Sequence, residues 1–218
     1  FAFFKTPIYR AELVMAPVMQ EKSGGLSALA GQFGGIASLA GVNLPSSGSD
    51  VDKVLATLKS RAFLSSFFEQ EKVALQFREG EQTDTLSSQG IYEKFTEEVL
   101  DLRKDNKTGL VILAIEWSEA SLAAKWANTL VAHLNEHQRQ FAIAEAQQSI
   151  DYLNQQLNKT SVVDMQQSIY RLIESQTKVI MLANVKKEYA MQVIDPALPP
   201  EKPVYPQRVL ILIVGVVL

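Results

Sequence analysis

Residues 119–159 read EASLAAKWANTLVAHLNEHQRQFAIAEAQQSIDYLNQQLNK, and this stretch contains neither glycine nor proline. Apolar residues recur at the spacing of a helix face, first at Leu122, Trp126, Leu130 and Leu134. The stretch therefore predicts one unbroken helix of about 60 Å at 1.5 Å per residue. Because a compact globule of this chain length has a diameter of about 45 Å, we expect the helix to project from a body.

A second long helix is predicted after a turn at residues 158–161, from Val162 to about Tyr189. Its apolar residues are spaced like a heptad repeat, at Met165, Ile169, Leu172, Val179 and Ala183. Glutamines are frequent from Gln138 to Gln176, where a solvated hairpin normally carries charges. Amides can exchange hydrogen bonds across an interface without burying ions, which favours packing against copies of the same chain.

We expect the helical pair to contact other copies or a glycan. The candidate residues are Trp126, Gln147, Leu153, Gln156, Met165, Ile169 and Leu172. Tryptophan often lines carbohydrate sites, yet Trp126 lies in the apolar row and equally fits a core position. Trp117, at the end of a predicted strand, is open to both interpretations.

The rest of the chain predicts a body of short elements. Residues 8–19 are typical of a strand, with Pro17 confining it to an edge or a bulge. The further elements that we expect are a helix over 50–70, a short extended piece over 72–77, a helix over 91–100, a β-hairpin over 100–117 and an extended segment over 190–194.

A glycine-rich segment from Ser23 to Ser49 carries no charge and contains a near-repeat of period ten. Its repeated glycines are Gly24, Gly25, Gly31, Gly34, Gly35 and Gly41. Glycine at this density disfavours an isolated helix, whereas the leucines and alanines are too apolar for a simple linker. We expect a mobile loop that rests on a neighbouring copy or lines the interior of an assembly.

Both chain ends are apolar. Residues 1–4 read FAFF, and residues 209–218 form an apolar run that covers about 15 Å as a helix, half of the ~30 Å hydrocarbon core. We interpret them as the end of one membrane-spanning helix and the start of another, although the second run also fits a buried strand. Prolines before it predict a stiff segment at the membrane, namely Pro196, Pro199, Pro200, Pro203 and Pro206.

Composition excludes several function classes. The net charge of −3 gives no electrostatic reason to expect a nucleic-acid partner. The absence of cysteine excludes disulfide frameworks, cysteine-ligated zinc, iron–sulfur clusters and thiol nucleophiles. The sequence predicts no cofactor.

One catalytic pattern is present. His133, Glu136 and His137 match H-x-x-E-H, a zinc motif of metallopeptidases. They include the only two histidines, and no third ligand or walled cleft is evident, so a polar pair near a helix contact is the competing interpretation. A zinc metallopeptidase therefore stays an alternative, as does a periplasmic adaptor of a secretion or efflux system, which also uses long hairpins.

Several features together resemble one known family. They are the segment TPIYRA at residues 6–11, the glycine-rich loop, the long helix and, above all, EYAMQVIDPALPPEKPVYPQR at residues 188–208. This combination resembles the Wzz family of bacterial polysaccharide co-polymerases, or chain-length determinant proteins. The resemblance implies an α+β fold with a membrane-proximal α/β base, a small mixed sheet and a long protruding helical hairpin.

The resemblance also implies a function and a location. It implies an inner-membrane protein whose periplasmic part assembles into a ring-like homo-oligomer such as an octamer. Such a protein is not an enzyme but sets the chain length of O-antigen lipopolysaccharide or a related glycan, with a membrane polymerase and the lipid-linked glycan as partners. The implied parts are a membrane helix over 1–4, a base over 5–118, a helical extension over 119–189, a last strand and proline-rich segment over 190–208, and a second membrane helix over 209–218.

Overall fold

The computed structural model describes residues 6–18, 47–80 and 87–206. The fold is α+β, as the sequence predicts, and the chain divides into two compact units. Among the described residues, unit 1 comprises 6–17, 54–80, 87–134 and 191–206, and unit 2 comprises 18, 47–53 and 135–190. The division falls inside the longest helix, between Leu134 and Asn135.

Unit 1 contains a four-stranded sheet in the order β2-β3-β1-β4. The strands are β1 (Tyr9–Pro17), β2 (Leu100–Lys104), β3 (Val111–Trp117) and β4 (Met191–Asp195). Every pairing is antiparallel, so the expectation of a mixed sheet is wrong. Strand β1 is an inner strand and not an edge, and its pairing with β4 shifts register between Val14 and Met15, which agrees with the alternative of a bulge. Pro17, which has no N–H for the ladder, is its last residue. The predicted hairpin is confirmed as β2 and β3.

The two faces of the sheet differ in character. On β1 the side chains of Ala11, Leu13 and Met15 are buried, and the register places Ile115 and Leu113 of β3 beside them. Alternate residues of β1 lie on the opposite face because successive strand side chains point to opposite sides. One face therefore belongs to the core, and the other carries charged residues.

Arg10 organises the charged face. Its guanidinium bonds Glu12 of its own strand at 2.7 Å, Asp101 of β2 at 2.6 Å and Glu116 of β3 at 2.6 Å. Burial lowers the pKa of Arg10, and the hydrogen bonds to Glu12, Asp101 and Glu116 more than offset that effect, so its pKa is raised. Arg103 joins the cluster through Glu12 and Asp101, each at 3.2 Å. These ion pairs tie the three strands together on the face opposite the core.

A tight turn joins β2 to β3. Asp105 accepts hydrogen bonds from the backbone N–H of Lys107 at 2.8 Å and from the hydroxyl of Thr108 at 2.7 Å. Gly109 adopts φ 72°, a left-handed conformation that glycine accepts without strain. The hydrogen bonds from Lys107 and Thr108 lower the pKa of the Asp105 carboxyl.

Short helices lie between β1 and β2 along the chain. They are α2 (Ser47–Leu58), α3 (Arg61–Glu71), α4 (Val73–Gly80), α5 (Ser88–Lys94) and the π-helical turn η2 (Phe95–Val99). The predicted single helix over 50–70 is two helices, because the Ser60 side chain caps α3 by accepting from the N–H of Phe63. The predicted extended piece over 72–77 is helical instead. Lys72 ends α3 in the left-handed conformation, and α4 begins at the next residue.

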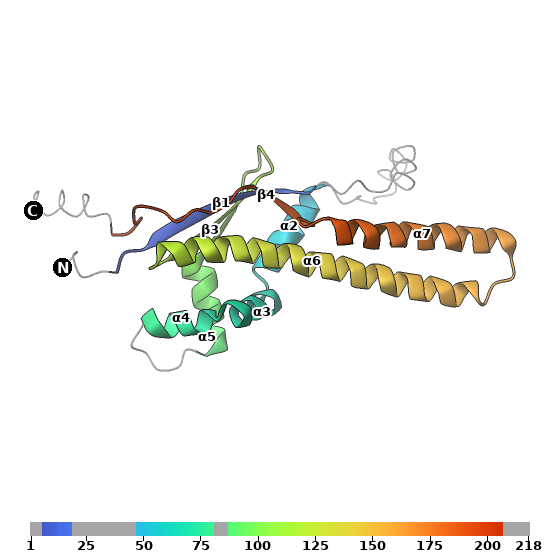
Figure 1. Cartoon of the computed structure of the whole chain (residues 1–218), viewed down its shortest axis with the longest axis horizontal. Helices are drawn as coiled ribbons and strands as arrows, with labels where there is room; N and C mark the ends of the chain where they lie inside the picture. The colour runs from blue at the N-terminus through green and yellow to red at the C-terminus, as the bar shows by residue number, and fades with distance from the viewer. Residues whose placement is uncertain (1–5, 19–46, 81–86, 207–218) are drawn as a thin grey trace, which may run out of the picture. The chain divides into compact units, whose positions relative to one another are not determined.

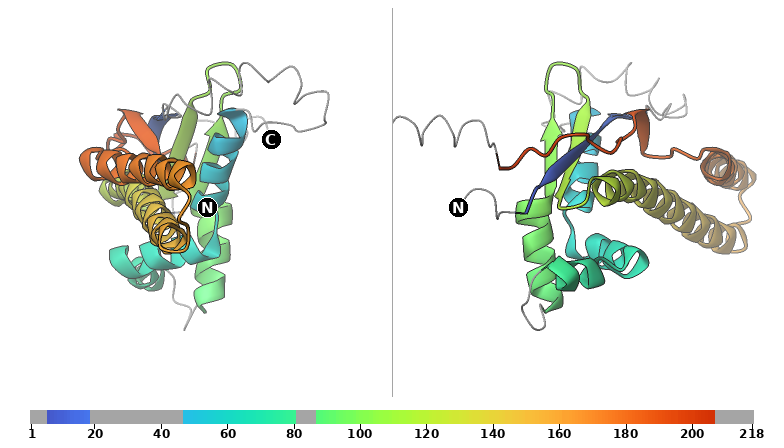
Figure 2. Two further views of the ribbon diagram at one scale, coloured as in Figure 1. Left: turned by 90° about the vertical axis from the view of Figure 1, so that its right-hand side faces the viewer. Right: turned by 60° about the vertical axis from the view of Figure 1, so that its left-hand side comes forward.

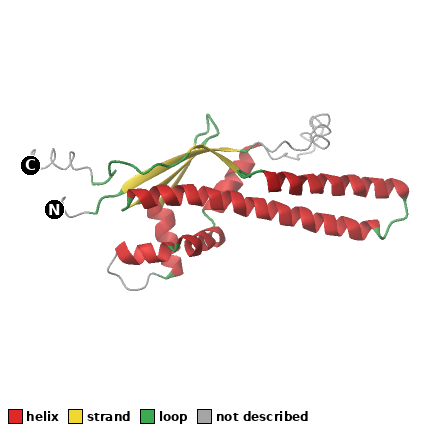
Figure 3. Cartoon of the chain, viewed as in Figure 1, coloured by secondary structure: helices red, strands yellow, loops and turns green. Residues whose placement is uncertain are grey.

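Helix α6 (Ala120–Leu157) confirms the predicted long helix. Its first half, up to Leu134, belongs to the core of unit 1 and lies between the sheet and helices α3–α5 (Figures 1 and 3). Trp126 is fully buried and lies 5.0 Å from the ring of Trp117 on β3 and 6.2 Å from Phe95 in η2. Aromatic contacts therefore join the sheet, η2 and α6 in one core.

Unit 2 consists mainly of a helical hairpin. Helix α7 (Val163–Val185) runs antiparallel to the second half of α6, and the two lie side by side in Figures 1 and 2. The predicted turn is confirmed, since α6 ends at Leu157 and α7 begins at Val163. Ile169 and Ala183 are the buried residues of α7.

The Asp105 turn makes a prediction about pH. The lowered pKa means that the carboxylate stabilises the fold at pH values above the ordinary aspartate pKa of 3.8, and that this contribution is lost as the pH falls through the lower, folded pKa. We expect a carboxyl ¹³C NMR titration to give Asp105 a midpoint below 3.8. Thr108→Val, which removes one donor, should raise that midpoint, whereas Thr177→Val on α7 should leave it unchanged.

Candidate functional site

The two ends of the described chain meet at one place in unit 1. The backbone N–H of Ile8 donates to the carbonyl of Tyr205 at 2.9 Å, and the N–H of Val204 donates to the carbonyl of Ile8 at 2.8 Å. The segment before β1 and the segment after β4 therefore run antiparallel as a short bridge. We call these residues, 8 and 204–205, the terminal bridge.

The apolar ends at 1–4 and 209–218 lie outside the described residues. Within the described part of the chain, no helix is long and apolar enough to cross a bilayer. Of the predicted proline-rich segment, Pro206 is buried, Pro200 is half-buried and the others are exposed, namely Pro196, Pro199 and Pro203.

Two asparagines of α6 hold the segment that leads to the terminal bridge. In unit 1, the amide of Asn128 donates to the carbonyl of Ala197 at 2.9 Å and accepts from its N–H at 3.1 Å. In unit 2, the buried amide of Asn135 accepts from the N–H of Ala190 at 2.8 Å. Sequence reasoning missed both, although two amides seven residues apart on an otherwise apolar helix face are a signal for such backbone contacts.

The hairpin of unit 2 exposes much apolar surface. Its exposed large apolar side chains are Phe141, Tyr152, Val162, Val163, Met165, Tyr170, Leu172, Met181, Leu182 and Val185. Exposed apolar side chains in this number make the hairpin a candidate for contact with another molecule. We call this set the apolar hairpin surface.

The residues predicted to make contacts fall into three groups. Met165, 55% exposed, and Leu172, 47% exposed, belong to the apolar hairpin surface. Gln147 is exposed and bonds Asp151, while Leu153 and Gln156 are half-buried. Ile169 is only 7% exposed, so its side chain packs within the hairpin.

Trp126 needs a correction. Its fully buried side chain packs in the core of unit 1, so it offers no surface to a glycan or to another copy. The physical reason is that the indole fills the space between Trp117 of the sheet and Phe95 of η2, which favours burial over contact. Trp117 is half-buried and packs 4.9 Å from Phe77, and it too belongs to this aromatic cluster.

The side chains of the H-x-x-E-H motif are engaged in other interactions. The His133 ring nitrogen Nε2 lies 2.8 Å from the Ser66 hydroxyl, and the ring packs 5.1 Å from Phe63. Both carboxylate oxygens of Glu136 accept from Arg139, at 2.7 and 2.9 Å. Among the described residues, no group of three or more histidine or acidic side chains is arranged to hold a metal ion.

Residues 23–46 of the predicted glycine-rich loop, with Gly24, Gly25, Gly31, Gly34, Gly35 and Gly41, lie outside the described residues, whereas residues 47–49, also predicted as loop, begin helix α2.

Comparisons with known proteins find matches only among solved structures. No model of a known protein family and no curated protein matches the chain. One matching structure is a fragment of WzzB, the polysaccharide co-polymerase from Salmonella Typhimurium. It is 13% identical, with 91% of this chain and 100% of that chain covered and a TM-score of 0.35.

A second match is a full-length bacterial polysaccharide co-polymerase. It is 10% identical, with 99% of this chain and 83% of that chain covered and a TM-score of 0.36. Both proteins are polysaccharide co-polymerases, the family that the sequence resembles.

The Asn128 contacts give a stability prediction. Asn128→Ala removes both partners of the buried Ala197 backbone, and an unsatisfied buried group costs about 1–3 kcal/mol. We expect the free energy of unfolding from urea titration to fall by that amount. The control Asn154→Ala, at an exposed position of the same helix, should change it by less than about 0.5 kcal/mol. Equal effects of the two variants would contradict the role given to Asn128.

Proposed function

We propose that the chain is the periplasmic part of a Wzz-family polysaccharide co-polymerase of the bacterial inner membrane. In this proposal it is not an enzyme. It assembles into a ring-like homo-oligomer and regulates how long a surface glycan, such as O-antigen, grows on a membrane polymerase. Its partners are other copies of itself, the polymerase and the lipid-linked glycan.

The observation that carries the proposal is the terminal bridge. The chain continues from Ile8 toward the apolar residues 1–4 and from Tyr205 toward the apolar residues 209–218. Three backbone hydrogen bonds join Ile8 to Val204 and Tyr205. A loop with both ends anchored in one membrane must direct both ends toward that membrane, and the terminal bridge, which places Ile8 beside Tyr205, is consistent with this arrangement.

The apolar hairpin surface supports self-association. Burying apolar area yields roughly 25 cal/mol per Å², so exposed side chains such as Met165 and Leu172 favour contact with another molecule. The unit also has few charges along α7 that would oppose close packing. Another copy of the same chain is present wherever the chain itself is present, so it is the simplest partner for this surface.

A regulatory role also agrees with the chemistry of the described residues. The motif that suggested a peptidase uses His133 and Glu136 in contacts with Ser66 and Arg139. We therefore place function in the surfaces of the chain and in its assembly, with the growing glycan made by the polymerase.

A substitution on the apolar hairpin surface tests this function. Leu172→Glu adds a charge to an exposed apolar position, so it should weaken assembly without unfolding the hairpin. We expect gel electrophoresis of the glycan to show a changed length distribution with normal total polymer. Native mass in nanodiscs, for a chain that includes both apolar ends, should shift toward smaller assemblies.

The matched control is Gln167→Glu, which places the same charge at an exposed polar position of the same helix. It should leave both the glycan lengths and the native mass unchanged. Loss of all polymer with Leu172→Glu would instead assign the chain to the polymerisation reaction itself. An unchanged glycan despite a reduced native mass would contradict the link between assembly and chain length.

A further inference from the structure

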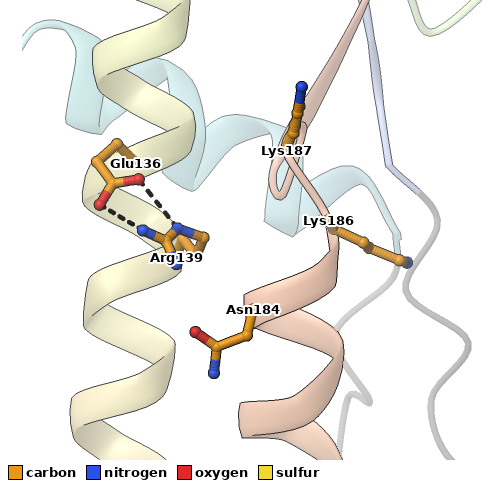
Figure 4. A pocket seen from close by; sticks show the side chains of 5 residues that line it. All are labelled: Glu136, Arg139, Asn184, Lys186 and Lys187. Atoms are coloured by element: carbon orange, nitrogen blue, oxygen red, sulfur yellow. Dashed lines mark hydrogen bonds and ion pairs between the residues drawn. The ribbon is translucent and has the colours of Figure 1, made fainter.

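Unit 2 contains an open cavity of about 330 Å³ near the base of the hairpin. Glu136 and Arg139 of α6 line it from one side, and Asn184, Lys186 and Lys187 line it from the end of α7 and the residues that follow. Figure 4 shows Arg139 paired with Glu136 on α6, Asn184 projecting from α7 toward α6, and Lys186 and Lys187 on the segment that follows α7. The volume lies at the lower end of the ~300–1,000 Å³ that is typical of small-molecule sites.

The charge of this cavity is opposite to that of the chain. Three cationic side chains against one carboxylate give its lining a formal charge of +2, whereas the whole chain carries −3. The positive charge of the lining attracts an anionic ligand at short range, and partial enclosure of the cavity reduces the screening of this attraction by salt.

Arg139 is positioned to take part in binding. Glu136 accepts from its Nε and Nη2 atoms, which fixes the plane of the guanidinium and raises its pKa. Five N–H groups are present on an arginine, so this pairing leaves the Nη1 donors for a ligand. An arginine fork of this kind matches the paired oxygens of a carboxylate or a phosphate.

The other groups complete the set. Within the described part of the chain, neither Lys186 nor Lys187 forms an ion pair within 4.0 Å. The amide nitrogen of Asn184 bonds the carbonyl of Ile180 at 2.9 Å, which directs the amide oxygen toward Arg139 (Figure 4). Lys186 and Lys187 both line the cavity, and they follow α7 directly.

We propose that this cavity binds an anionic group of a saccharide, a carboxylate or a sugar phosphate, with Arg139 as its main ligand and Lys186 and Lys187 as the surrounding cations. The proposal rests on the proposed function, because it makes the glycan the source of the ligand. It adds a chemical class, namely that acidic glycans contact the hairpin directly at the base of α7.

Binding of defined sugars to the purified chain in detergent tests the proposal. By isothermal titration calorimetry, trigalacturonate should bind at least tenfold more tightly than the neutral maltotriose, and high salt should weaken it. Galactose 1-phosphate distinguishes the sources. Tight binding of this sugar without binding of trigalacturonate assigns the site to phosphate, and the reverse assigns it to carboxylate.

Charge-reversal variants locate the site. Lys187→Glu should raise the Kd of the bound sugar about tenfold, and Lys186→Glu should raise it as well, because both lysines line the cavity. The control Lys159→Glu, an exposed position at the other end of the hairpin, changes net charge equally and should leave Kd unchanged. Thermal denaturation of each variant shows that the fold is retained.

Two results would overturn the proposal: equal affinity for the acidic sugars and maltotriose, or equal weakening by Lys187→Glu and Lys159→Glu. Neither depends on glycan length in cells, so failure of the site is distinguishable from failure of the proposed function. The reverse also holds, since an unchanged glycan in Leu172→Glu cells would leave these binding constants untouched.

Discussion

Helix α6 is one continuous ladder of backbone hydrogen bonds that serves two different environments. From Ala120 to Leu134 it presents a broad apolar face to the core of unit 1, where Trp126, Leu130 and Leu134 are fully buried. From Asn135 to Leu157 it belongs to unit 2 and carries glutamines and half-buried apolar residues. A proline in the interior of α6 would separate the two roles, because it removes a backbone donor and costs about 3 kcal/mol, whereas a glycine would cost about 1 kcal/mol and leave the hydrogen bonds intact.

Two asparagines of this helix form hydrogen bonds to the backbone of distant segments. Asn128 satisfies both backbone groups of Ala197, and Asn135 satisfies the N–H of Ala190 just before β4. Buried amides need partners, so each also specifies which backbone segment must lie against it. The path from the hairpin back to the terminal bridge is thereby set by polar contacts as well as by the pairing of β4 with β1.

Periodicity predicted the long elements well because their signals are repeated many times. The uninterrupted spacing after Glu119 gave α6, and the turn residues between Lys104 and Leu110 gave the β2–β3 hairpin. Single residues decided what was missed. Ser60 caps α3 and Lys72 takes a left-handed conformation, and neither departs from the apolar pattern around it.

Contacts between distant segments were beyond the sequence pattern for a similar reason. The apolar row that includes Trp126 fits a core and an interface equally, and only the packing of Trp117 and Phe95 against it decides for the core. Strand direction in the sheet also depended on how β4 returns to β1. The cavity around Arg139 joins residues 45 or more positions apart, which no local spacing indicates.

The terminal bridge has a thermodynamic consequence if both chain ends are fixed in one bilayer, as proposed. The denatured loop is then closed as if by a covalent link, and closing a loop of about 100 residues or more removes entropy equivalent to roughly 4–5 kcal/mol from the denatured state. The lipid bilayer would constrain the denatured chain as a disulfide bond does, and this chain has no cysteine to form a disulfide bond. Excised from its membrane, the same domain would lose that contribution while keeping every native contact.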